Sequence, residues 1–100
     1  MKWEFSWVAH KRDMRGKNHL YGLIQTDDQR YFRLWGECKS ARIHLREEFF
    51  GYGRNSRITA KNKLDDGYKM ISTDKIKTSF PDAYNDIGMQ FAMKVLKDNV

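Results

Sequence analysis

The sequence predicts an α+β fold: an antiparallel sheet of about four to five strands, with one short helix and a C-terminal amphipathic helix packed on it. Three observations lead to this prediction. Apolar and polar residues alternate through the first half of the chain, as in strands that bury one face. Short polar links separate these runs, as in hairpins. After Pro81, apolar residues recur with helical spacing. One hundred residues suit a single domain, 1–100, with one modest core.

The first two strands are predicted over residues 2–9 and 19–26, with turn residues at 27–29 closing the second. The polar, basic stretch 10–18 is predicted to be a flexible loop, which is either simply solvated or a second arm that touches phosphate. Aromatic side chains remove large apolar areas from water, so the core-facing side chains of the first strand are expected to be Trp3, Phe5, Trp7 and Ala9.

Residues 30–37 and 40–50 are predicted to form the third and fourth strands, which share one cationic and aromatic face if they pair antiparallel. With Phe32 and Leu34 in the core, the third strand turns Tyr31, Arg33 and Trp35 outward. An arginine between two aromatic rings is pre-oriented, and the rings offer flat surfaces to a base or sugar. The alternative is that Trp35 packs under a neighbouring loop. The fourth strand would add to the same face the side chains of Arg42, His44, Arg46 and Glu48.

Two helices are predicted in the second half. The first runs from Asn55 or Ser56 to about Asp66, after a supple loop at 51–53, and Gly67 stands where a helix C-cap favours glycine. A brief strand at 68–71 returns to the sheet, followed by a polar link at 72–77. The second helix covers about 81–97, with Pro81 in its first turn. Its predicted apolar stripe is Tyr84, Ile87, Phe91 and Val95, widened by Gly88, Ala92 and Leu96.

Positive charge is concentrated between residues 30 and 63. This third of the chain holds nine basic residues against three acidic ones, an excess equal to the +6 net charge of the whole protein. Aromatic residues lie among these cations, which is the pattern of a surface that meets phosphate. The candidate nucleic-acid-binding residues are Arg30, Tyr31, Arg33, Trp35, Lys39, Arg42, Arg46, Arg54, Arg57 and Lys61.

Several other classes of protein do not fit the sequence. No apolar run reaches the roughly 18 residues of a membrane-spanning helix, and the N-terminus does not resemble a secretory signal. Cys38 is the only cysteine, which fits a reducing compartment, most simply the cytoplasm. No residues show metal-ligand spacing, and no cofactor is expected. An enzyme is not expected either, because His44, Glu47 and Glu48 cannot all share one strand face.

Three motifs resemble the WGR domain, over residues 17–71. They are Lys17-Asn18-His19-Leu20-Tyr21, the strand that closes in Trp35-Gly36-Glu37, and Lys63-Leu64-Asp65-Asp66-Gly67-Tyr68. The resemblance implies an antiparallel sheet with a packed helix. In poly(ADP-ribose) polymerases such a domain binds DNA near strand ends, with the motif tryptophan against the sugar-phosphate backbone and the motif arginine on phosphate. No catalytic domain of those polymerases fits in 100 residues.

Carried over to this chain, the resemblance gives Trp35 the stacking role. Glu37 occupies the position of the motif arginine and would repel phosphate, and the glycines that usually follow are replaced by Cys38, Lys39 and Ser40. Arg33 and Lys39 are the nearby substitutes for the missing arginine.

The sequence therefore predicts a small, basic, non-enzymatic nucleic-acid-binding protein, with DNA favoured over RNA, that uses phosphate contacts and aromatic stacking. The alternative is a small regulatory or inhibitory protein that binds an acidic surface of a larger protein. Single-stranded and duplex partners are both compatible with the sequence, as are monomeric and oligomeric states.

Overall fold

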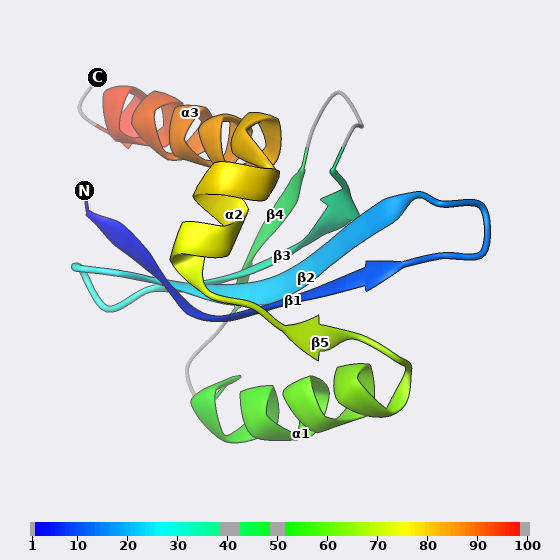
Figure 1. Ribbon diagram of the computed structural model, residues 1–100. Coiled ribbons are helices and arrows are strands. Elements are labelled where there is room, and N and C mark those ends of the chain that lie inside the picture. Colours follow the sequence, from blue (N-terminus) through cyan, green and yellow to red (C-terminus); the bar gives the residue numbers. More distant parts are fainter. Residues whose placement is uncertain (1, 39–42, 49–51, 99–100) are drawn as a thin grey trace.

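The computed structural model describes the backbone of residues 2–38, 43–48 and 52–98, and the side chains of the same residues except 52–57 and 95–98. Within this part of the chain the fold is α+β, with a five-stranded antiparallel sheet between helices (Figure 1). The elements in chain order are β1 (Trp3–Arg12), β2 (Asn18–Thr26), β3 (Tyr31–Glu37), β4 (His44–Glu48), α1 (Tyr52–Asp65), β5 (Lys69–Met70), α2 (Thr73–Ser79) and α3 (Pro81–Asp98).

The strands lie in the spatial order β4-β3-β2-β1-β5, and every neighbouring pair is antiparallel. β1, β2 and β3 are consecutive hairpin strands, β4 forms one edge, and the short β5 forms the other. Helices α2 and α3 cover one face of the sheet, whereas α1 lies beneath the other face (Figure 1). The third and fourth strands do pair antiparallel, as their shared face requires.

The predicted arrangement of side chains on the first strand is wrong. Phe5 pairs with Ile24 and Trp7 pairs with the adjacent Leu23, because the register shifts between Phe5 and Trp7. Adjacent residues of β2 point to opposite faces, so Phe5 and Trp7 do too. Ser6 is the extra residue of a β-bulge, which a simple alternation pattern does not reveal. Trp3 and Phe5 therefore face α3, while Trp7 and Ala9 face α1.

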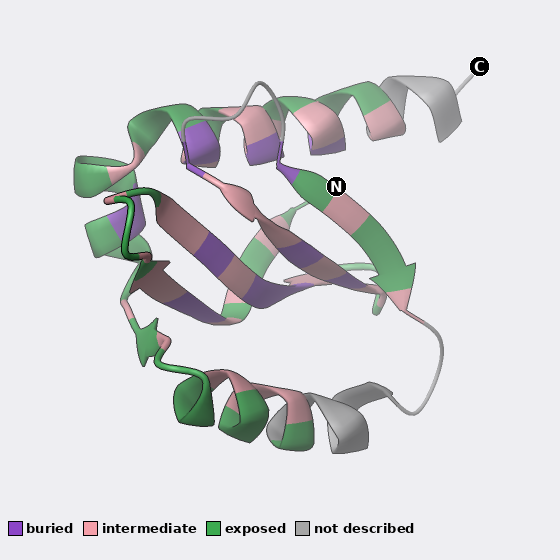
Figure 2. Cartoon of the chain, turned by 90° about the vertical axis from the view of Figure 1, so that its right-hand side faces the viewer, coloured by how far each residue is buried: buried purple, intermediate pink, exposed green. Residues whose placement is uncertain are grey.

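The main core lies between the sheet and helices α2 and α3, where the buried residues of both layers meet (Figure 2). The C-terminal helix begins at Pro81 as predicted, and Ile87 and Phe91 are buried. Ala92 is exposed, contrary to the prediction, and Ala83 is buried instead. The predicted stripe residues Val95 and Leu96 lie outside the described side chains.

Helix α3 also fastens the start of β4 through two polar side chains. Asp86 Oδ2 accepts a hydrogen bond from the backbone N–H of Ile43 at 2.6 Å. Gln90 Nε2 donates to the carbonyl oxygen of Ile43, also at 2.6 Å, and to Asp86 Oδ2 at 3.0 Å. Both backbone groups of Ile43, a buried residue, are thus satisfied by one helix face. This clamp fixes where the edge strand β4 enters the sheet.

The two remaining helices, α1 and α2, begin and end at other residues than the sequence predicts. The predicted polar link 72–77 is mostly helix α2, which is capped by Ser72 Oγ accepting from the N–H of Lys75 at 3.1 Å. Helix α1 starts at Tyr52, so part of the predicted 51–53 loop is helical. The predicted C-cap at Gly67 is confirmed by its φ of +97°. The N–H groups of Gly67 and Tyr68 bond back to Leu64 and Lys63, which is a Schellman ending.

None of the helices in the described part of the chain is long and apolar enough to cross a membrane.

Candidate nucleic-acid interface

The register of β3 and β4 gathers the predicted aromatic and basic side chains on the face of the sheet that lies away from α3. In this register Tyr31 lies opposite Glu48, Arg33 opposite Arg46, and Trp35 opposite His44. Directly opposed residues of an antiparallel pair project from the same face, with β-carbons about 5 Å apart. The predicted side of the described β3 and β4 residues is therefore confirmed. Lys39 and Arg42, also proposed for this surface, lie outside the described residues.

Trp35 and His44 form a flat pair of stacked rings at the edge of the sheet. Their ring centroids are 5.3 Å apart with an interplanar angle of 18°. Trp35 is half-buried and His44 is exposed, so the pair is accessible from the β4 side. Such a pair offers a flat aromatic surface next to solvent, as stacking with a base or sugar requires.

Arg33 and Arg46 are the adjacent cations, and their surroundings differ. Arg46 is exposed on the edge strand. Arg33 is half-buried, and its Nε lies 3.1 Å from Oε1 of Glu48, a carboxylate whose side chain is only 11% exposed. This ion pair offsets part of the Arg33 charge, although Glu48 Oε1 accepts no hydrogen bond within the described part of the chain. Among the described residues of β3 and β4, this face therefore carries two guanidinium groups, from Arg33 and Arg46, and two carboxylates, from Glu37 and Glu48.

The face is less open than the sequence predicts, because helix α1 lies beneath it (Figure 1) and contacts β2 and β5. Leu23, in the middle of this face, is buried. Lys63 Nζ of α1 lies 4.3 Å from the ring centroid of Tyr21 and 5.4 Å from that of Tyr68. Tyr31, Arg33 and Trp35 are each half-buried rather than fully outward. The accessible part of the face is thus the β3–β4 half.

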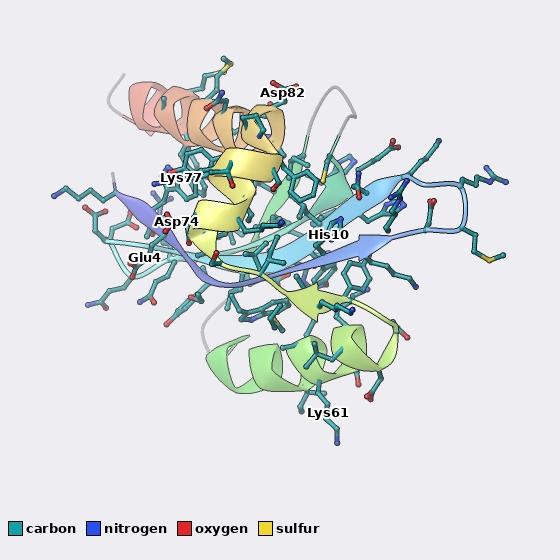
Figure 3. All side chains as sticks on the ribbon, viewed as in Figure 1. Glu4, His10, Lys61, Asp74, Lys77 and Asp82 are labelled. Atoms are coloured by element: carbon teal, nitrogen blue, oxygen red, sulfur yellow. The ribbon has the colours of Figure 1, made fainter. Side chains whose placement is uncertain are left out.

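Other candidate residues are not brought to this face. Arg30 Nε pairs with Asp28 at 2.8 Å, and its Nη1 lies 3.9 Å from Glu47. Its guanidinium is 5.7 Å from the ring of Phe32, a core residue, so Arg30 lies on the α3 side. Lys61 is exposed on α1 and points away from the sheet (Figure 3). Arg54 and Arg57 belong to α1, but their side chains lie outside the described residues.

The β1–β2 hairpin tip is a second basic surface, and it is better ordered than the predicted flexible loop. Asp13 Oδ1 accepts hydrogen bonds from the N–H groups of Arg15 at 2.8 Å and Lys17 at 2.9 Å. Its Oδ2 lies 2.8 Å from Nε2 of His19. Gly16 takes a φ of +82°, which closes the turn with a left-handed residue. The sequence signal was Asp13 followed three residues later by glycine.

These hydrogen bonds predict a pH dependence for the loop. The hydrogen bond with His19, followed by that from the Lys17 N–H, lowers the pKa of Asp13 from 3.8 to about 2. The folded-state pKa lies below the unfolded value, so the stabilising contribution is present above about pH 4 and is lost as the pH falls through about 2. We expect the amide resonances of Arg15 and Lys17 in NMR spectra to titrate with a midpoint near pH 2. These amide resonances should not titrate in Asp13→Asn. A midpoint near pH 3.8 in the wild-type protein would contradict the lowered pKa of Asp13.

The chemistry of the other reactive groups is limited in the part of the chain that the structure describes. Burial raises the pKa of the Cys38 thiol to about 11, with a smaller contribution from Glu37, so this thiol stays protonated at neutral pH. Among the described residues, no three His, Cys, Asp or Glu side chains come together as metal ligands. Comparison with protein-family models, with curated proteins and with solved structures finds no match for the chain.

Proposed function

We propose that this protein is a small, non-enzymatic nucleic-acid-binding protein, with DNA as the favoured partner. Arg33 and Arg46 contact phosphates, and Trp35 stacks on a base or sugar. The observation that supports this proposal most directly is the register of β3 and β4, which sets two guanidinium groups side by side next to the Trp35–His44 stack. The affinity comes mainly from phosphate neutralisation, which releases counterions from the nucleic acid.

The resemblance to the WGR domain favours DNA as the partner and Trp35, at the position of the motif tryptophan, as the stacking residue. Glu37 stands in place of the motif arginine, and its Oε2 lies 4.0 Å from Nζ of Lys17. Lys17 comes from the neighbouring hairpin and offsets the negative charge at the point where the family has a positive one. The repulsion of phosphate by Glu37 is therefore reduced, although this exposed pair contributes little to stability.

A stacking role for Trp35 is tested by its replacement. Base–aromatic stacking is worth about 1–3 kcal/mol per base by alanine substitution. We expect Trp35→Ala to weaken binding of labelled single-stranded or duplex DNA several-fold or more in fluorescence anisotropy, with Trp35→Phe intermediate because it keeps a ring. Circular dichroism verifies that both variants are folded. Unchanged affinity in the folded Trp35→Ala variant would place the contact elsewhere.

The salt dependence tests the electrostatic part of the proposal. The logarithm of the affinity should fall linearly with the logarithm of the salt concentration, with a slope of about −0.9 per neutralised phosphate for duplex DNA. An affinity that stays constant between low and moderate salt would exclude phosphate neutralisation as the source of binding. RNA of the same sequence, measured in parallel, tests the preference for DNA.

Glu48→Gln should strengthen nucleic-acid binding. Glutamine has nearly the same shape as glutamate but removes the carboxylate charge that faces Arg33 at 3.1 Å. Arg33 then presents its full charge, and the repulsion between the carboxylate and phosphate disappears. We expect a several-fold gain in affinity at low salt that diminishes as salt is added. Glu4→Gln, an equal charge change at an exposed position of β1, is the control and should have a smaller effect. A loss of affinity in Glu48→Gln would mean that the ion pair itself is required.

A second candidate function is docking on an acidic surface of a larger protein, as a regulator or inhibitor. Met89 and Met93 favour it, because both are exposed and lie one turn apart on α3, and methionine adapts to varied protein surfaces. Pull-down from nuclease-treated lysate, followed by titration of the purified partner, distinguishes the two functions. Binding that survives nuclease and Trp35→Ala but is lost in Met89→Ala would support the second.

A further inference from the structure

The β1–β2 hairpin extends as an arm beyond the rest of the sheet (Figure 1). β1 and β2 remain paired out to Arg12 and Asn18, and the N–H of Cys38, directly after β3, donates to the Asn18 carbonyl oxygen at 2.8 Å, so the part beyond the other strands is the loop 13–17. The loop beyond is closed by backbone hydrogen bonds from Asp13 N to Lys17 O at 2.8 Å and from Gly16 N to Asp13 O at 3.0 Å. Together with the Asp13 side-chain bonds, they give the tip one defined shape.

The tip combines cations with one apolar side chain. Met14 is the most exposed of the large apolar side chains in the described part of the chain, at 105% of the reference value. Arg12, Arg15 and Lys17 are exposed around it. The Arg12 guanidinium reaches toward the turn, since a β-carbon added at Gly16 would lie 3.4 Å from Arg12 Nη2. Two carboxylates lie at the tip: Asp13 is engaged with backbone N–H groups and His19, and Glu37 lies 4.0 Å from Nζ of Lys17.

We propose that this tip enters the minor groove of duplex DNA, where Met14 wedges between base pairs while Arg12, Arg15 and Lys17 contact the flanking phosphates. The inference rests on the proposed nucleic-acid-binding function and adds the form of the partner and the groove. Apolar wedges that include methionine, carried by basic segments, partly unstack base steps and kink the duplex.

The size of the arm favours the minor groove for the tip. A turn presents only one or two side chains at its end, which suits a groove about 6 Å wide, whereas a whole two-stranded ribbon suits the major groove, about 12 Å wide. The minor groove also has a strong negative potential where it is narrow, and arginine and lysine side chains are attracted there. A preformed tip loses little conformational freedom on binding.

The arm and the sheet face can reach the same duplex. Ala9, Tyr21, Trp35 and His44 form one row across the sheet. Asp13 lies four residues beyond Ala9 along β1, which is about 13 Å at roughly 3.3 Å per residue. One turn of B-DNA is about 34 Å long. A duplex held at Trp35 and Arg46 with its axis along the strands extends past the hairpin tip within the same turn.

The test uses a duplex of about 20 base pairs, two helical turns, with 2-aminopurine as a reporter of unstacking. We expect saturation with the wild-type protein to raise the 2-aminopurine fluorescence. Met14→Ala should abolish most of this rise and weaken binding roughly three- to ten-fold. Ile58→Ala, a matched removal of an exposed apolar side chain on α1, should change neither quantity. Because Met14 is exposed, both variants should keep the wild-type melting curve.

Replacing guanosine by inosine identifies the groove. Inosine lacks the 2-amino group that guanosine places in the minor groove, and the major-groove edge is unchanged. We expect the inosine duplex to bind several-fold more tightly. Equal affinity for the two duplexes would overturn the groove assignment, and wild-type binding with no rise in fluorescence would overturn the wedge.

The outcomes separate this inference from the proposed sheet-face contact. Binding that is sensitive to Trp35→Ala but shows no unstacking refutes the arm and retains the sheet face. Unstacking that depends on Met14, with binding insensitive to Trp35→Ala, supports the arm and refutes the sheet face. Absence of binding to any tested DNA or RNA refutes both.

Discussion

Phe91→Ala should lower the free energy of unfolding by about 3–5 kcal/mol, the range for removing a buried phenylalanine from a packed core. Phe91 is only 2% exposed. Its ring stacks on Trp3 at a centroid distance of 5.5 Å and meets the edge of Phe32 at 5.1 Å. The substitution leaves a cavity where α3, β1 and β3 meet, and it also removes aromatic contacts worth about 0.5–1.5 kcal/mol each.

Urea denaturation followed by tryptophan fluorescence measures this effect, and the same helix supplies the control. Met93 lies two residues away on α3 and is 57% exposed. Met93→Ala should change the free energy of unfolding by no more than about 0.5 kcal/mol. Similar losses in the two variants would mean that α3 does not pack on the sheet through its Phe91 side.

Arg46→Glu should weaken DNA binding about ten-fold or more at low salt and flatten the salt dependence by about one unit of slope. In the proposed interface, the substitution removes one phosphate contact. It also puts a carboxylate opposite Arg33, so it reverses the charge at this edge of the sheet. Arg46 is exposed on an edge strand, so the free energy of unfolding should change little. Fluorescence anisotropy at several salt concentrations measures both quantities.

Lys61→Glu is the matched control for Arg46→Glu. Lys61 is also exposed, but it points away from the sheet on α1 (Figure 3). Both variants have a formal net charge of +4, two less than the wild-type +6. We expect Lys61→Glu to weaken binding far less, through the general field alone. Equal weakening by the two variants would mean that binding follows net charge and has no defined site at β4.

Much of the sheet could be predicted from the sequence, because its strands bury one face and therefore alternate. Which side chains of β3 and β4 share a face follows from this alternation. The start of α3 could be predicted separately, because proline is favoured in the first turn of a helix and α3 begins at Pro81. The face to which each side chain of β1 points could not be predicted in this way, because one extra residue, Ser6, reverses the alternation between Phe5 and Trp7. Helix α2 was missed because its apolar content is a single buried residue, Ile76, although Ser72 followed by Asp74 is a start signal.

The candidate site could be predicted only in part, because its exposure depends on long-range packing. The face that Trp35 shares with His44 and Arg46 follows from strand alternation, but the register of the two strands and the position of α1 beneath the same face do not. A second reason why the site could be predicted only in part is that carboxylates pair with some of its cations. Arg30 and Arg33 count as cations in the sequence. Alternation places Glu48 on the face of Arg33, but only the folded chain shows the ion pairs with Asp28, Glu47 and Glu48. Local charge counts therefore overstate how much positive potential a surface presents.

The clamp from Asp86 and Gln90 to Ile43 has a consequence for the order of folding. Asp86 follows Ile43 by 43 residues, so the edge strand cannot be locked in place until α3 has been synthesised. Contacts of such sequence separation close a long loop and form late, whereas the β1–β2 hairpin closes locally and early. On the ribosome, β1, β2 and β3 can assemble first, and the strand that bears His44 and Arg46 is completed last.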